Sequence, residues 1–227
     1  MNPYFEIFQA WQPWLGFPRT PPTGTPPALP DELRAAVDPD MLDVFDQMSA
    51  LSPRMGGMTL RDLLVRHYAW SIPSPEALSA AAHFSGGRIL DVGAGNGYWA
   101  SLLADLGVDV LATDLHPVPN GYMGAAQHYP VQVMDAAEAA AAHPDRTLMM
   151  SWPPLDDPMG ARALEAYRGD RVIYLGEWGG ACGTPALFRA LNTEWEHVPS
   201  AAAIPRWTGM NDRLVLLNRK RTPDKPR

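Results

Sequence analysis

Residues 88–99 read RILDVGAGNGYW, and this stretch decides the fold. A short apolar run leads into three alternate glycines, Gly93, Gly95 and Gly97, and a helical pattern of apolar residues follows them. Glycine adopts left-handed backbone conformations without a steric penalty, so the glycines predict a tight turn that a ligand can approach closely. A helix that begins at such a turn presents free N–H groups to the ligand. The stretch therefore predicts a buried strand, a ligand-binding turn and a helix.

The spacing of the glycines separates two classes of nucleotide-binding turn. The dinucleotide-binding pattern is G-x-G-x-x-G, and its helix faces a pyrophosphate. Here Tyr98 occupies the position of the third glycine in that pattern. Asp91 lies two residues before the first glycine, where a carboxylate repels a pyrophosphate but attracts an ammonium group. The turn therefore favours a cationic ligand, and a dinucleotide such as NAD is the alternative.

Two further acids end predicted strands: Asp114 ends the run VDVLATD, and Asp135 ends VQVMD. With the acid-x-G-x-G-x-G core, they make residues 76–220 resemble the seven-stranded, class I family of S-adenosylmethionine (SAM)-dependent methyltransferases. The resemblance implies SAM as cofactor, with Asp114 at its ribose hydroxyls and Asp135 near its adenine amine. The alternative is that the glycines only form turns and the acids only cap strands. The candidate cofactor-binding residues are Asp91, Gly93, Gly95, Gly97, Asp114, Leu115, Asp135, Ala136, Ser151 and Trp152.

Short apolar runs alternate with helical patterns through this segment, which predicts parallel strands joined by right-handed helical crossovers. The last two runs have no helical pattern between them, which predicts a hairpin. The expected fold class is α/β: a three-layer, Rossmann-like, mostly parallel seven-stranded sheet with a C-terminal antiparallel hairpin, plus an N-terminal helical lid. The predicted strands are 88–92, 108–113, 131–134, 147–151, 171–176, about 197–203 and 213–218.

The first part of the chain has a different character. Five aromatic residues recur at helical spacing, which predicts one aromatic stripe on a helix. A free helix of this kind would expose a sticky patch, so we expect it to pack against the rest of the protein. The aromatic residues are Tyr4, Phe5, Phe8, Trp11 and Trp14. The expected division of the chain is a helical, aromatic lid (1–75) with a proline-rich connector (17–30), a SAM-binding domain (76–221) and a tail (222–227).

The carboxyl ends of parallel strands meet at one edge of a sheet, where ligands bind. Ser151 and Trp152 lie at such an end, and Pro153 and Pro154 follow them. Some amino-group methyltransferases have Asn or Asp, then Pro-Pro and an aromatic residue, at the end of the fourth strand; only the two prolines match here. The turn is therefore either a rigid wall whose carbonyls accept hydrogen bonds from an amine, or a stiff loop without a chemical role.

Three residues are candidates for a catalytic role. Glu177 follows a strongly apolar strand, where a partly buried carboxylate could move a proton or bind an ammonium group; a capped carboxylate is the alternative. Tyr68 and Trp70 lie where the resemblance places the segment that covers the cofactor. Their rings could hold a sulfonium by cation–π attraction, and ordinary packing is the alternative.

The composition argues against several other functions. With 18 Lys and Arg residues against 25 Asp and Glu residues, the net charge of −7 is unsuited to a nucleic-acid backbone. Cys182 is the only cysteine and the six histidines show no ligand spacing, so we expect no metal. No apolar run suits a membrane span and residues 1–15 lack a basic segment, so we expect a cytoplasmic protein without a membrane partner. The expected partner is a small-molecule substrate, and a homodimer is left open.

Three functions fit these features. The first and favoured one is biosynthetic methyl transfer to a small molecule, in which the protein aligns the reacting atoms and excludes water. The second is attack on the aminopropyl carbon of SAM, by aminocarboxypropyl transfer or by cyclisation to a cyclic amino acid such as azetidine-2-carboxylate, with release of methylthioadenosine. The altered turn after the fourth strand keeps this second function open. The third is a SAM-binding partner subunit without turnover.

Overall fold

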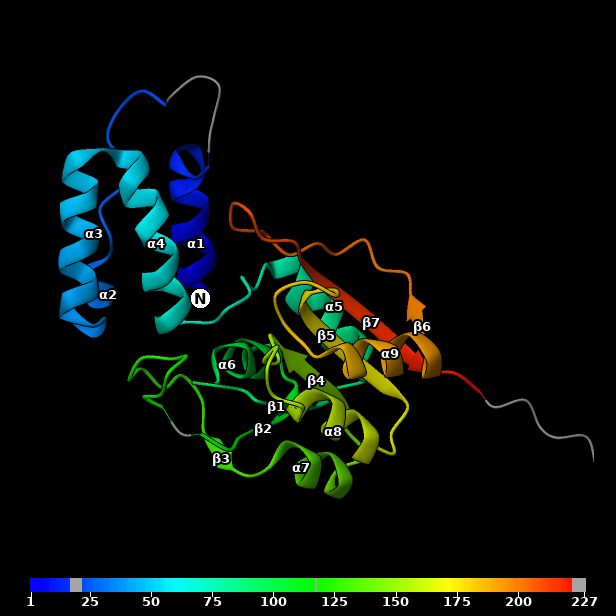
Figure 1. Ribbon diagram of the computed structural model, residues 1–227. Coiled ribbons are helices and arrows are strands. Elements are labelled where there is room, and N and C mark those ends of the chain that lie inside the picture. Colours follow the sequence, from blue (N-terminus) through cyan, green and yellow to red (C-terminus); the bar gives the residue numbers. More distant parts are fainter. Residues whose placement is uncertain (17–21, 117, 222–227) are drawn as a thin grey trace, which may run out of the picture.

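A seven-stranded sheet with the strand order β3-β2-β1-β4-β5-β7-β6 forms the centre of the molecule (Figure 1). The structure is a computed structural model, which describes residues 1–16, 22–116 and 118–221. β1 lies between β2 and β4, in the middle of the parallel part of the sheet. The strands are β1 (Arg88–Val92), β2 (Asp109–Asp114), β3 (Val131–Val133), β4 (Thr147–Ser151), β5 (Arg171–Glu177), β6 (Trp195–Val198) and β7 (Asp212–Arg219).

The first five strands are parallel, and the last two form an antiparallel edge. Asp91 of β1 lies opposite Ala112 of β2, in parallel register. In β7, Asp212 lies opposite Glu177 of β5, and the strand runs antiparallel to both β5 and β6. These pairings confirm the predicted mostly parallel sheet with a C-terminal hairpin.

Helices cover both faces of the sheet, so the fold has three layers (Figure 1). Alternate side chains of a strand point to opposite faces. Ile89 therefore packs in one core with α5 and α6, whereas Leu90 and Val92 pack in a second core with α7, α8 and α9. The helices are α5 (Pro75–Ser85), α6 (Tyr98–Asp105), α7 (Ala136–Ala142), α8 (Met159–Ala166) and α9 (Pro185–Glu194).

The N-terminal helices form a group beside the sheet domain, and α1 packs onto that domain, as the sequence predicted (Figure 1). Tyr4, Phe8 and Trp11 are buried, and the indole Nε1 of Trp207 donates a hydrogen bond to the Tyr4 hydroxyl over 3.0 Å. Phe5 is only partly buried. The elements are α1 (Pro3–Trp11), the short η1 (Gln12–Trp14), α2 (Asp31–Ala36), α3 (Pro39–Leu51) and α4 (Pro53–His67); part of the proline-rich connector (17–21) and the tail (222–227) lie outside the described residues.

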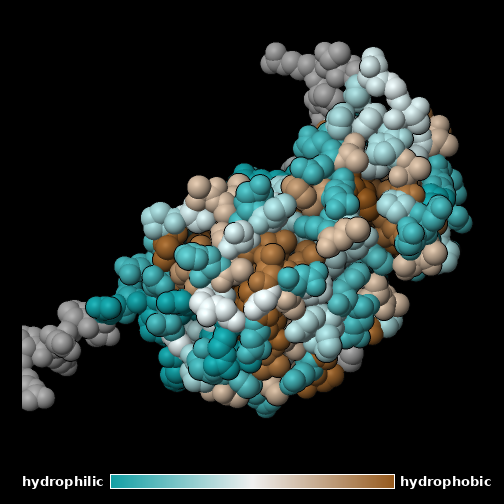
Figure 2. Space-filling model, turned by 180° about the vertical axis from the view of Figure 1, so that it is seen from behind, coloured by the Kyte–Doolittle hydropathy of each residue, from teal (hydrophilic) through white to brown (hydrophobic). Residues whose placement is uncertain are grey.

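The distribution of hydrophobic residues over the surface follows the division into N-terminal helices and sheet domain. Figure 2 shows hydrophobic residues along the middle of the molecule, where the N-terminal helices meet the sheet domain, and mostly hydrophilic residues around them. None of the helices in the described ranges has both the length and the apolar character that crossing a bilayer requires.

Two segments, a strand and a loop, differ from what the sequence pattern predicted. β6 spans Trp195–Val198 rather than about 197–203, because Pro199 has no N–H to donate to a strand ladder. In the described part of residues 115–130, between β2 and β3, no helix forms and the chain runs as a loop. This loop covers the edge of the sheet at which the strands end, so it becomes part of the site.

Candidate functional site

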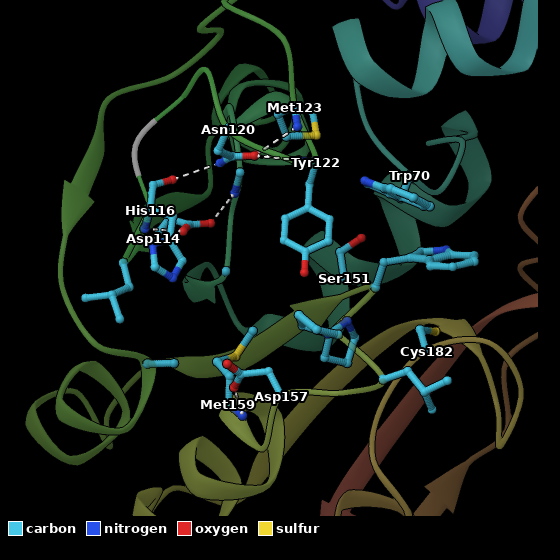
Figure 3. A pocket seen from close by; sticks show the side chains of 18 of the residues that line it. Trp70, Asp114, His116, Asn120, Tyr122, Met123, Ser151, Asp157, Met159 and Cys182 are labelled. Atoms are coloured by element: carbon cyan, nitrogen blue, oxygen red, sulfur yellow. Dashed lines mark hydrogen bonds between the residues drawn. The ribbon is translucent and has the colours of Figure 1, made fainter.

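A cavity of about 530 Å³ opens at the carboxyl ends of the parallel strands (Figure 3). It is lined by the glycine turn after β1, the residues that follow β2, β3 and β4, and the segment after α4. A second, smaller cavity of about 50 Å³ adjoins the glycine turn. Of the predicted site residues, the larger cavity is lined by Trp70, Gly93, Gly95, Asp114, Leu115, Asp135, Ala136, Ser151 and Trp152, and the smaller one by Tyr68, Trp70, Asp91, Gly93, Gly95 and Ser151.

The glycine turn has the backbone conformation that the sequence predicted. Gly93, Gly95 and Gly97 have φ angles of 66°, 59° and 78°, which L side chains rarely adopt. A Cβ atom on Gly93 would lie 2.7 Å from the methyl carbon of Met159 across the cavity. Gly97 is the N-cap residue of α6 and lines neither cavity, so its role is to let the chain turn.

Asp91 is a buried carboxyl group with an unfilled hydrogen-bonding position. It is the fourth residue of β1, only 2% of it is exposed, and its Oδ1 has no hydrogen-bond partner among the described residues. Burial, with a smaller contribution from Asp114, raises its pKa to about 8. A buried carboxylate without a partner is costly, so the small cavity next to it favours a cationic ligand.

Asp114 is the last residue of β2, and it is fixed against the glycine turn. Its Oδ2 accepts a hydrogen bond from the backbone N–H of Gly95 over 2.9 Å, and its Oδ1 accepts one from His116 over 2.8 Å. The carboxylate keeps further lone pairs toward the cavity that it lines. It is therefore placed to accept hydrogen bonds from ligand hydroxyls.

Asp135 caps α7, and both of its carboxylate oxygens already have partners within the protein, which the sequence did not indicate. Its Oδ1 accepts hydrogen bonds from the backbone of Ala137 over 2.8 Å and of Glu138 over 3.3 Å. Its Oδ2 pairs with Arg162 at 3.2 Å. A ligand amine at this end would have to share the carboxylate with the cap and with Arg162.

The end of β4 and the residues after it form another wall of the cavity, where Ser151 also borders the small cavity at the glycine turn. The Oγ atoms of Ser151 and Ser71 lie 3.1 Å apart and share a hydrogen bond. Trp152 has a φ of 50°, which is strained for a residue with a side chain. Its indole Nε1 donates to Asp212 over 3.2 Å, so contacts with another strand hold this strained residue in place.

The ring faces of Tyr68 and Trp70 are largely covered by packing. Tyr68 stacks on Tyr4, with ring centroids 5.4 Å apart, and on His128 at 5.6 Å. Trp70 lies 5.1 Å from the ring of Trp152, and the guanidinium of Arg61 lies over it at 5.6 Å. The structure does not give Tyr68 the open face that a cation–π role needs, and Trp70 remains as a wall of the cavity.

Glu177 does not reach the cavity. Its Oε2 accepts a hydrogen bond from the backbone of Ala181, and its Oε1 accepts one from Asn211, both over 2.7 Å. These two N–H groups hold the carboxylate behind the end of β5. The interpretation as a capped carboxylate therefore describes Glu177, and nothing in this arrangement supports the predicted proton transfer.

Sequence reasoning missed the residues that the loop between β2 and β3 contributes. Asn120 accepts hydrogen bonds from the backbone N–H groups of Tyr122 and Met123 over 2.8 and 2.9 Å and donates to the carbonyl of His116. This turn directs Tyr122 into the cavity (Figure 3). The Asn-Gly pair at residues 120–121 was a readable turn signal, but the direction of the loop depends on tertiary contacts.

Comparisons with known proteins find distant similarity in structure and none in sequence. No protein-family model and no curated protein matches the chain. A protein in the NADB-Rossmann superfamily from Streptococcus agalactiae aligns with a TM-score of 0.42 and 12% identity, covering 68% of this chain and 72% of that chain. The strand order of the sheet decides the fold. The chain has a Rossmann-like α/β fold.

Two other similar solved structures are methyltransferases. Magnesium protoporphyrin IX methyltransferase from Synechocystis, solved with bound SAM, aligns with a TM-score of 0.39 and 12% identity, covering 97% of this chain and 98% of that chain. The 1,6-didemethyltoxoflavin-N1-methyltransferase of Burkholderia thailandensis aligns with a TM-score of 0.41 and 20% identity, covering 88% and 94%. These similarities concern the fold, and the ligand of this chain follows from its own cavity.

Proposed function

We propose that the chain binds SAM and transfers its methyl group to a small molecule. The observation that carries the proposal is the buried Asp91 carboxyl, whose Oδ1 has no partner and which borders a small cavity at the glycine turn. The ammonium group of SAM fits this need, whereas a pyrophosphate would be repelled by the same carboxylate. This unfilled buried acid beside the glycine turn therefore supports SAM over a dinucleotide as the ligand.

The rest of the cavity fits the other parts of SAM. Asp114 can accept from the ribose hydroxyls, because it lines the cavity and keeps lone pairs beyond its two backbone bonds. Leu115, Ala136 and Met159 give an apolar slot for the adenine ring, with Asp135 at its edge. When bound, SAM supplies an electrophilic methyl group on a sulfonium. The protein's own contribution is to hold the two reactants in line and to exclude water from them.

The direct test is a calorimetric titration of the full chain with SAM. We expect Asp91→Asn to weaken SAM binding about 10- to 100-fold, since a charge-assisted hydrogen bond contributes about 1.5–3 kcal/mol. Asp105→Asn removes an exposed acid on the far end of α6 and is the matched control, with binding unchanged.

Two results would contradict the proposal. One is wild-type protein that does not bind SAM, and the other is Asp91→Asn protein that binds SAM as tightly as wild type. We expect the variants to keep the fold, because Asn has the shape of Asp and fills the same space. Circular dichroism on each variant checks this.

A further inference from the structure

The charged side chains that line the end of the cavity beyond the glycine turn are all negatively charged. We name this end the acceptor end, since the cofactor proposed above would occupy the part at the glycine turn. Its walls are mainly apolar and aromatic, and Tyr122 projects into it from the loop between β2 and β3 (Figure 3). We assign to the acceptor end the cavity residues Trp70, Tyr122, Ser151, Trp152, Pro153, Pro154, Leu155, Asp156, Asp157, Ala181 and Cys182, of which Trp70 and Ser151 also line the small cavity at the glycine turn.

The charges at this end are carboxylates. Asp156 and Asp157 are exposed at its mouth, and Asp157 also accepts a hydrogen bond from the backbone of Met159 over 2.7 Å. Behind the Trp152 wall lies Asp212, which is 2% exposed and has a buried Oδ1 without a hydrogen-bond partner among the described residues. Asp156 and Asp157 make the acceptor end favourable for positive charge, whereas Trp152 separates Asp212 from the cavity.

The basic groups nearby are already engaged. Arg162 is the only Lys or Arg among the described residues that line the cavity, and it pairs with Asp135 at 3.2 Å. Arg61 lies over Trp70 and pairs with Asp62 at 3.2 Å, but it does not line the cavity. An anionic ligand at the acceptor end would therefore meet carboxylates without a free cationic partner.

We propose that the acceptor is a small nitrogen base, an amine or a nitrogen heterocycle with an apolar body, and not a carboxylate, phosphate or other anion. This inference rests on the methyl transfer proposed above and names its substrate class.

The charge balance of the reaction supports a nitrogen acceptor. The lone pair of the acceptor nitrogen forms the new N–C bond as the C–S bond breaks, and the electron pair of that bond stays on sulfur, which becomes a neutral thioether. The positive charge thus passes to nitrogen, and a primary or secondary amine then releases one proton to water. Asp156 and Asp157 stabilise the charge on nitrogen after the transfer, whereas they would repel an anionic acceptor before it reacts.

The polar groups at the acceptor end suit an uncharged nucleophile with N–H bonds. The Ser151 hydroxyl, paired with that of Ser71, can accept a hydrogen bond from an amine N–H. Burial raises the pKa of the Cys182 thiol to about 11, so this group adds no charge at neutral pH. The nitrogen attacks only as the uncharged base: a heterocycle of low basicity is already neutral, whereas an amine bound as ammonium first releases a proton to water, because Glu177 lies away from the cavity.

The test uses three probes that share a phenethyl body: phenethylamine, phenethyl alcohol and hydrocinnamate. Each is titrated calorimetrically into the full chain saturated with S-adenosylhomocysteine. We expect the ammonium probe to bind about 3- to 10-fold more tightly than the alcohol, because exposed charge pairs are individually weak. We expect the carboxylate probe to bind less tightly than the alcohol. Raising the salt concentration should reduce both differences.

Two matched double variants test whether the preference for the ammonium probe comes from the carboxylates of the acceptor end. In Asp156→Asn/Asp157→Asn protein, the ammonium and alcohol probes should bind equally, and binding of the alcohol should stay at its wild-type value. Asp43→Asn/Asp105→Asn protein changes the net charge by the same amount at exposed positions away from the cavity and should keep the preference.

Three results would overturn the inference. If hydrocinnamate binds as tightly as phenethylamine, or if the ammonium probe does not bind, the substrate class is wrong although the proposed methyl transfer stands. If the preference for ammonium survives in the Asp156→Asn/Asp157→Asn protein, its source lies elsewhere. If S-adenosylhomocysteine itself does not bind, the proposed function is wrong, and the inference about the acceptor, which depends on it, is wrong as well.

Discussion

Asp91 couples cofactor binding to the uptake and release of a proton. Burial raises its pKa to about 8 in the folded protein, against about 3.9 for an ordinary Asp. Between these two pH values the folded chain holds a proton that the unfolded chain has lost. The stability that this group contributes is therefore full below about pH 4 and is lost as the pH rises toward 8. A bound ammonium group favours the ionised form and so displaces the proton.

The coupling gives a pH dependence for SAM binding. For the wild-type chain we expect SAM to bind more tightly as the pH rises from about 5.5 to about 7.5, by at most about tenfold per pH unit. Asp91→Asn should remove this dependence. Calorimetry in two buffers with different ionisation enthalpies measures the protons released, and a wild-type chain that releases none at pH 7 would contradict the assignment of Asp91.

Replacing Gly97 or Gly107 by alanine distinguishes two destabilising effects of a side chain at a left-handed position: backbone strain and crowding by neighbouring atoms. Their φ angles are 78° and 83°. A Cβ at Gly97 would lie 2.8 Å from the Cβ of Tyr129, whereas a Cβ at Gly107 meets nothing within 4 Å. We expect Gly107→Ala to cost about 1 kcal/mol from backbone strain. Gly97→Ala should cost about 1–3 kcal/mol more from crowding. Urea unfolding measures both, and equal losses would show that crowding at the turn is unimportant.

Among the elements, α1 is held to the sheet domain by a bond between residues far apart in sequence. Tyr4 is fully buried, and its hydroxyl accepts from Trp207 in the connection between β6 and β7. Tyr4→Phe keeps the ring and leaves a buried indole N–H unpaired, so we expect a loss of about 1–3 kcal/mol in the free energy of unfolding. In a double-mutant cycle with Trp207→Phe the two losses should be less than additive. Strict additivity would mean that the bond does not hold α1.

Local signals in the sequence predicted many of the elements well. The starts of α5 and α9 can be read from the sequence, because Ser74 and Thr184 are each followed by a proline, and a hydroxyl cap with a proline at the first position suits a helix N-terminus. β6 was placed too late, since the apolar pattern continues past Pro199 although hydrogen bonding does not. Glu177 was assigned a catalytic role because its sequence position does not reveal the two backbone amides that bind it.

At the scale of the whole molecule, the site is assembled between the N-terminal helices and the sheet. The carbonyl of Arg66, at the end of α4, accepts from Gly124 over 2.8 Å, and that of His67 accepts from Asn96 beside the glycine turn over 2.8 Å. The strand-end acids could be read from the sequence because they follow local strand patterns. Tyr122 and the Trp152–Asp212 pair could not be read from it, since they join segments that only the tertiary fold brings together.

Methyl transfer requires that this cavity directs an acceptor to the methyl group of SAM. The most direct measurement is chromatography with mass detection on pure protein incubated with SAM, first alone and then with a metabolite extract. Our account predicts S-adenosylhomocysteine with the extract and not without it. Methylthioadenosine released without any acceptor, above the chemical background, would contradict methyl transfer and show that the aminopropyl carbon is attacked instead.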